Sequence, residues 1–94
     1  MKYPVSLPDF DSPISIPHNT EYIIPENGWI FRYARTTTSW SEFYIKNQLL
    51  SGIYTDGTNH YTAEDSIFLP VEKNTSIKSI GCSPIEYIFY PSKR

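Results

Sequence analysis

The sequence has little cysteine, no excess of charge of one sign and no long hydrophobic run. Its single cysteine, Cys82, excludes a disulfide within the chain. Eight lysine and arginine residues are interspersed with ten aspartate and glutamate residues, so there is no basic stripe that would bind nucleic acid. No apolar run approaches the ~20 residues of a membrane helix, and the first residues lack the apolar region of a signal peptide. We therefore expect a soluble protein made in the cytoplasm, with no nucleic-acid partner and no membrane insertion.

Helical periodicity and catalytic motifs are also missing from the sequence. No window of ten or more residues has apolar positions at helical spacing, and residues 62–65 are at most one helical turn. His18 and His60 lie far apart without a nucleophile pattern, and the carboxylates do not form a calcium-binding loop. We therefore expect no enzymatic activity, no catalytic residues, no metal site and no cofactor.

The sequence does contain a series of short β-like segments separated by turns. In the run from residue 22 to residue 35, Pro25 and Gly28 have turn chemistry and are flanked by β-branched and aromatic residues. Trp29 opens an alternating strand beside this turn, so we assign Trp29 to the core. Asn47 and Gln48 are expected to form a tight hairpin turn. The segments expected to form strands are 14–16, 21–24, 29–35, 42–46, 49–55, 60–62, 66–71, 76–80 and 85–90.

The 94 residues are enough for one domain, which we place at residues 14–94 and interpret as an all-β antiparallel sandwich of about eight strands. Residues 1–13 carry Pro4, Pro8 and Pro13, which favour extended backbone, and form a Pro-rich N-terminal arm. This arm either leads, loosely packed, into the first strand or docks on a neighbouring subunit or a larger particle.

Candidate binding residues are aromatic and polar side chains near the loop that follows residue 55. Rigid rings beside hydrogen-bonding groups suit the recognition of a carbohydrate or a protein epitope. The alternative is that these rings belong to the core or to a subunit interface, since eight tyrosines and two tryptophans exceed what a small core needs. The candidate binding residues are Trp40, Tyr54, Asp56, Asn59, His60 and Tyr61.

Two further stretches carry a family resemblance. The first is residues 22–34, with Ile-Pro-Glu-Asn-Gly-Trp-Ile at the centre, and the second is residues 66–77 together with the ending Tyr-Ile-Phe-Tyr-Pro. Together they resemble C-terminal modules of bacteriophage tail fibres and related virion appendages, although Asn74 and Thr75 stand where such modules have Gly-Asp. The resemblance implies a jelly-roll-like β-sandwich that assembles as a homotrimer and binds host surface glycans or proteins.

We therefore expect a phage virion structural protein, located in the virion, that contacts a host receptor or other virion proteins. Two alternatives remain open. One is a capsid decoration or head-fibre protein with no receptor role, and the other is a small phage-encoded protein that binds and inhibits a host target.

Overall fold

The computed structural model describes residues 6–55 and 62–93, and the ordered elements within these ranges are all strands. These strands are β1 (Ile14–Ser15), β2 (Glu21–Ile23), β3 (Gly28–Thr36), β4 (Trp40–Ile45), β5 (Gln48–Tyr54), β6 (Ala63–Val71), β7 (Ser76–Gly81) and β8 (Glu86–Pro91). In these two ranges no helix is long and apolar enough to cross a membrane.

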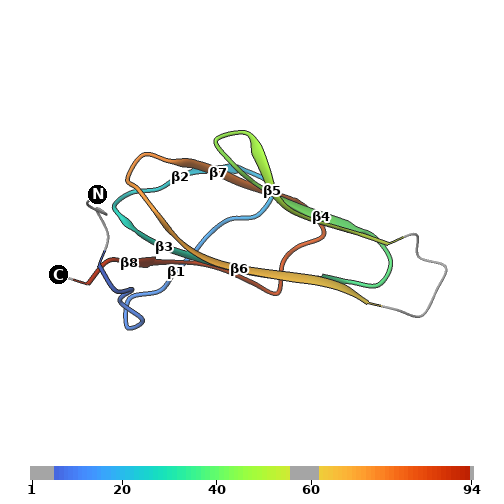
Figure 1. The fold of residues 1–94 in the computed structure, drawn as a ribbon, viewed down its shortest axis with the longest axis horizontal. Coiled ribbons are helices and arrows are strands. Elements are labelled where there is room, and N and C mark those ends of the chain that lie inside the picture. Colours follow the sequence, from blue (N-terminus) through green and yellow to red (C-terminus); the bar gives the residue numbers. More distant parts are fainter. Residues whose placement is uncertain (1–5, 56–61, 94) are drawn as a thin grey trace.

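The strands form two antiparallel sheets of four, packed against each other (Figure 1). One sheet, here called the β3 sheet, has the order β1-β8-β3-β6, and the other, the β4 sheet, has the order β2-β7-β4-β5. The first strand thus pairs with the last, the second with the seventh, the third with the sixth and the fourth with the fifth. This is the strand order of a jelly roll. The predicted jelly-roll-like sandwich of about eight strands is confirmed.

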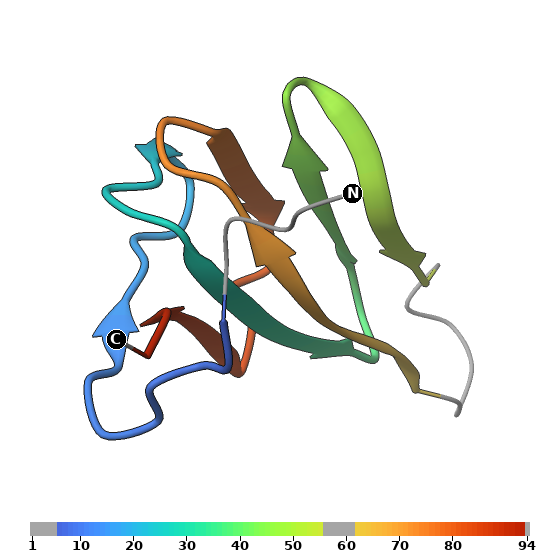
Figure 2. The same ribbon diagram turned by 60° about the vertical axis from the view of Figure 1, so that its left-hand side comes forward.

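Strand β3 lies inside its sheet, paired with β6 on one edge and β8 on the other (Figure 2). Its side chains alternate between the two faces, as the sequence predicts. The inward set is Ile30, Arg32 and Ala34, and the outward set is Trp29, Phe31 and Tyr33. The assignment of Trp29 to the core is wrong: its ring lies on the outer face, stacked on Phe68 at 5.1 Å. Both sets are rich in apolar groups, so alternation separates the two faces without saying which one is inside.

The hydrophobic core lies between the sheets and draws on both of them. Ile30 and Phe89 of the β3 sheet meet Phe43 and Ile77 of the β4 sheet, and all four are at most 1% exposed. Each such side chain contributes roughly 1.5–3 kcal/mol by leaving water. The remaining buried members of this cluster are Ile16, Ile24, Val71 and Tyr87.

A buried arginine ties the two sheets together. Arg32 is 1% exposed, its Nε donates to Ser79 Oγ at 3.1 Å, and its Nη2 donates to Ser41 Oγ at 2.5 Å. Its guanidinium lies over the Phe43 ring, 5.5 Å from the centroid. Ser79 Oγ is in turn 2.9 Å from Nδ1 of His18. Burial lowers the pKa of Arg32, yet an arginine stays protonated in a protein, so the interior holds a positive charge. Among the described residues, no carboxylate lies within ion-pair distance of it.

The hairpin turn between β4 and β5 lies close to its predicted position. Lys46 and Asn47 both have positive φ, 51° and 63°, which is the two-residue type I′ turn that hairpins favour. The turn thus lies one residue earlier than the predicted pair 47–48. Residues 62–65, which looked helix-like, enter β6 at Ala63, because β6 pairs with β3 along nine residues. Long-range pairing overrides the local preference there.

Gly28 has a different role from the one the sequence predicts. It is absent from the residues with positive φ and instead begins β3. A Cβ at this position would meet Phe89 Cζ at 2.6 Å and would also collide with the backbone of Tyr90. Gly28 therefore allows a close approach of β8 to β3.

The described part of the N-terminal arm lies along the end of β8. Asp9 N donates to Pro91 O at 2.8 Å, and Lys93 N donates to Leu7 O at 2.8 Å. Trp29 Nε1 also donates to Ser6 O at 2.7 Å. Residues 6–9 therefore continue the β3 sheet by backbone pairing with the C-terminal segment of the same chain.

Candidate functional site

The predicted binding residues Trp40 and Tyr54 lie opposite each other on the outer face of the β4 sheet. They are register partners on β4 and β5, and they are 42% and 56% exposed. Cross-strand partners lie about 4.5–5.5 Å apart at Cβ, so the two rings form one exposed surface. The other four predicted residues, Asp56, Asn59, His60 and Tyr61, lie outside the described residues, in the segment that joins β5 to β6.

Glu42 is the polar centre of this surface, and it was not among the predicted binding residues. Its Oε1 accepts a hydrogen bond from Tyr44 Oη at 2.7 Å, and its Oε2 accepts one from Tyr54 Oη at 2.5 Å. Gly52 is the register partner of Glu42, and the Tyr54 ring lies across it, where a Cβ would collide with that ring. The absence of a side chain at Gly52 therefore lets Tyr54 reach Glu42. We call Glu42, Tyr44 and Tyr54 the tyrosine–glutamate cluster.

The two tyrosine hydroxyls fix the charge of this cluster. Their hydrogen bonds lower the pKa of Glu42, the Tyr54 bond more than the Tyr44 bond. The same bonds raise the pKa of each tyrosine, because a neighbouring carboxylate disfavours a phenolate. Both hydroxyl protons point at Glu42, so the remaining lone pairs can only accept hydrogen bonds. The cluster is anionic and complements a ligand that donates hydrogen bonds.

A shallow depression of about 240 Å³ lies on the same sheet, beside the cluster. Tyr44 lines it together with Lys78, its register partner on β7, and Glu21, the partner of Lys78 on β2. Ile80, the register partner of Glu42, completes an apolar part of the wall. The outer face of the β4 sheet thus presents exposed rings, hydrogen-bond acceptors and one ammonium group in a continuous array.

The outer face of the β3 sheet carries a second group of aromatic side chains, centred on Phe68 of β6. Its ring centroid lies 5.1 Å from Trp29, 6.2 Å from Phe31 and 6.2 Å from Phe10 of the arm. Phe10 also meets Tyr90 edge-on at 5.0 Å. A shallow, almost wholly apolar depression of about 320 Å³ lies between Phe10, Phe31, Phe68 and Tyr90. We call these four residues the aromatic pocket; Phe10 and Phe68 are 61% and 47% exposed.

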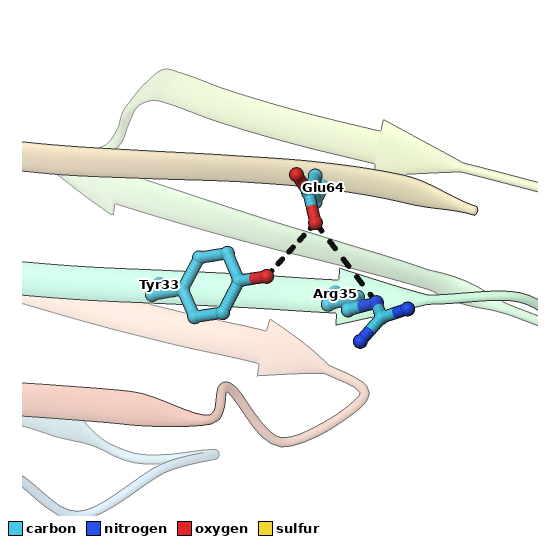
Figure 3. Close-up of polar contacts among 3 residues, drawn as sticks. All are labelled: Tyr33, Arg35 and Glu64. Atoms are coloured by element: carbon cyan, nitrogen blue, oxygen red, sulfur yellow. Dashed lines mark hydrogen bonds and ion pairs between the residues drawn. The ribbon is translucent and has the colours of Figure 1, made fainter.

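One end of this face is polar (Figure 3). Tyr33 Oη donates to Glu64 Oε2 at 2.8 Å, and Arg35 Nε lies 3.9 Å from the same oxygen. The hydrogen bond to Glu64 raises the pKa of Tyr33. Arg35 and Glu64 are both more than half exposed, so their ion pair contributes little to stability.

Sequence reasoning separated the two faces of β3 but missed the aromatic pocket. Phe10, Phe31, Phe68 and Tyr90 come from four distant parts of the chain, and only the sheet order β8-β3-β6 brings three of them side by side. The available signal was that Phe31 alternates with Arg32 on β3. Charged side chains are mostly exposed, so the general rule predicts that Arg32, and not Phe31, faces outward.

Within the two described ranges, no three His, Cys, Asp or Glu side chains come together to hold a metal ion. Hydrogen bonds to the Ser39 and Thr36 side chains lower the pKa of the Cys82 thiol, and Thr36 Oγ1 lies 3.8 Å from its sulfur.

No protein-family model, no curated protein and no solved structure matches this chain.

Proposed function

We propose that this chain is a non-catalytic structural protein of a bacteriophage virion. In this proposal it is a tail-fibre tip or a similar appendage module that assembles as a homotrimer and contacts a host receptor or other virion proteins. The observation that carries the proposal is the presence of exposed aromatic side chains on the outer faces of both sheets. Aromatic residues are enriched where proteins associate, and the fold class agrees with the family resemblance.

The two outer faces support two separate roles. The aromatic pocket on the β3 sheet is nearly free of polar atoms, which suits burial against another protein. The surface around Trp40 and Tyr54 combines rings with the acceptors of Glu42, which suits a sugar or a protein epitope that donates hydrogen bonds. The proposed recognition residues are Trp40, Tyr54, Asp56, Asn59, His60 and Tyr61, together with Glu42.

Receptor contact is tested with Trp40→Ala and Tyr54→Phe, each compared with Tyr33→Phe. Tyr33→Phe is a matched control, because it also removes an exposed hydroxyl that donates to a carboxylate, but on the opposite sheet. We expect both β4-sheet variants to lose glycan-array binding and to stop competing with phage adsorption to host cells, whereas the control retains both. Alanine at residues 56, 59, 60 and 61 extends the test. If all of these variants bound glycans and competed with phage adsorption as the unmodified chain does, the assignment of these residues to a recognition site would be wrong.

Virion location is tested by asking whether the protein co-purifies with intact particles from infected cells. Presence at the tail fibre agrees with the proposal. Presence only on the capsid would replace it with a decoration role, and presence only in the cell lysate would replace it with binding to a host target.

A further inference from the structure

The two exposed rings beside Glu42 each lie against the backbone of a glycine. The Tyr54 ring crosses Gly52, and a Cβ at Gly81 would meet Cε3 of the Trp40 ring at 2.8 Å. Main chain therefore covers part of one side of each ring. Trp40 and Tyr54 are nonetheless about half exposed, so the exposed part of each ring faces away from the sheet. The face of an aromatic ring is electron-rich, so these surfaces attract C–H groups and cations.

The tyrosine–glutamate cluster adds a negative charge to this surface. Tyr44 and Tyr54 direct both hydroxyl protons at Glu42, so the cluster presents acceptors to a ligand and keeps its donors to itself. In the part of the chain that the structure describes, no lysine or arginine nitrogen lies within ion-pair distance of Glu42. On β7 the register places Ile80 opposite Glu42, whereas Lys78 lies opposite Tyr44. The charge of Glu42 is therefore not neutralised by these neighbours.

A second tyrosine–carboxylate pair, on the opposite sheet, differs in this respect. Tyr33 Oη donates to Glu64 as Tyr54 Oη donates to Glu42, but Arg35 Nε lies 3.9 Å from the same oxygen of Glu64. A cation of the chain itself therefore accompanies Glu64. The described hydrogen bonds to the Glu42 carboxylate come from hydroxyl groups instead. The comparison indicates that Glu42 is the carboxylate to which an external cation adds a new interaction.

We propose that the outer face of the β4 sheet binds a glycan through a sugar that carries a free, protonated amino group. The C–H face of the sugar packs on the rings of Trp40 and Tyr54, and the ammonium group donates hydrogen bonds to Glu42. An ammonium group has three donors and no acceptor, so it matches a cluster that presents acceptors alone. This inference rests on the proposed receptor contact and names the class of ligand.

The size of the surface favours a sugar over a protein epitope. Two half-exposed rings leave roughly 200 Å² of aromatic surface, which is far below the ~800 Å² that each partner buries in a standard protein interface. The neighbouring depression is shallow, with a volume of about 240 Å³. A surface of this size holds one sugar or two. The contact is therefore weak, and ligand concentrations up to about the millimolar range are needed to measure it.

The test compares a short oligosaccharide of glucosamine with its fully N-acetylated counterpart. Both have the same sugar rings, but only the first carries ammonium groups in a mildly acidic buffer. NMR titration of the full chain measures both affinities, and the shifted amide signals should belong to β4 and β5. We expect the glucosamine oligosaccharide to bind at least about 10-fold more tightly, because hydrogen bonds between charged groups are the stronger ones. High salt should reduce this preference, since salt screens exposed charges.

Glu42→Gln is the decisive variant, and Glu64→Gln is its matched control. Each variant replaces a carboxylate that accepts from a tyrosine hydroxyl with an amide of the same shape, so both change the net charge equally. Circular dichroism checks that both are folded. We expect Glu42→Gln to bind the two oligosaccharides about equally and Glu64→Gln to keep the preference for the amine. A preference that survives in Glu42→Gln would overturn the role of Glu42.

The remaining outcomes separate this inference from the proposed receptor contact. Equal binding of both oligosaccharides by the unmodified chain would overturn the amino-sugar inference and leave contact with neutral glycans intact. Tighter binding of a lysine-rich peptide than of the glucosamine oligosaccharide would overturn it in favour of a protein epitope. Binding of neither oligosaccharide would overturn it as well. Only if the glycan array and the adsorption assay were also negative would the proposed receptor contact fall with it.

Discussion

Replacing Arg32 with methionine tests whether the buried guanidinium stabilises the sandwich. The change removes the hydrogen bonds to Ser41 and Ser79, each about 1.5–3 kcal/mol for a charged donor, and the contact with the Phe43 face, up to about 2 kcal/mol. Against this, the folded chain no longer has to take a cation out of water, which costs several kcal/mol per ion. Methionine also fills most of the same space and adds roughly 1.5–3 kcal/mol of apolar burial.

These contributions nearly cancel, because the two serines keep other partners. Ser41 Oγ still donates to Cys82 O at 3.0 Å, and Ser79 Oγ remains 2.9 Å from His18 Nδ1. We therefore expect Arg32→Met to change the free energy of unfolding by less than about 2 kcal/mol in either direction. Arg32→Ala leaves a cavity between the sheets and should lower the free energy of unfolding by about 2–5 kcal/mol relative to the methionine variant.

Urea denaturation followed by tryptophan fluorescence measures both variants, and thermal unfolding checks them, because 1 kcal/mol shifts the Tm of a domain this small by roughly 4–8 °C. The two variants differ in the volume they fill, while both remove the charge. An equal, large loss of stability in both would mean that the guanidinium network, and not the packing volume, holds the two sheets together. That result would refute the reasoning.

Three further changes test local features of the fold. Tyr54→Phe should raise the pKa of Glu42 toward its ordinary value of 4.5, because the largest cause of its lowering is lost. Glu42 has a lowered pKa when folded, so the stability it contributes is present above about pH 4.5 and is lost as the pH falls below it; carboxyl NMR titration checks both statements. Gly28→Ala should destabilise the domain by about 1–3 kcal/mol in urea titrations, because its Cβ would overlap the buried Phe89 ring. Lys46→Asn should raise the Tm slightly, since asparagine tolerates positive φ better than lysine, and an unchanged or lower Tm would contradict that reason.

The sequence predicted the strands well because short-range signals define them. Alternation along β3 and the turn residues near Asn47 are local features, and the structure places the strands and that turn close to where those features predict. The side of β3 that faces inward is decided by the packing of the β4 sheet against the β3 sheet, which no local pattern contains. For this reason Trp29 was assigned to the wrong face, and Arg32 was not recognised as buried.

For the candidate surfaces too, the sequence predicts some of the residues but not the contacts between them. Tyr54 is a predicted binding residue, and the structure shows that it is exposed. The predicted strand begins at residue 42, whereas β4 begins at Trp40, so the structure and not the sequence puts Trp40 and Glu42 on one face. Their contact through Tyr54 depends on the register between β4 and β5 and on the missing side chain of Gly52. Those are properties of the folded hairpin. A sequence pattern can therefore indicate which aromatic residues are exposed, but it does not indicate which residues they contact.

The two-layer sandwich explains why this chain has more aromatic residues than its core holds. Each strand turns about half of its side chains inward, and one layer between two four-stranded sheets has room for only a small core. Here part of that layer is taken by Arg32 and its serine partners. Among residues 6–55 and 62–93, the rings of the buried apolar cluster are those of Phe43, Phe89 and Tyr87. Several of the described rings lie outward, with Phe68 on one sheet and Trp40 on the other. These exposed rings add little to the stability of a single chain, which supports the proposal that they contact other molecules.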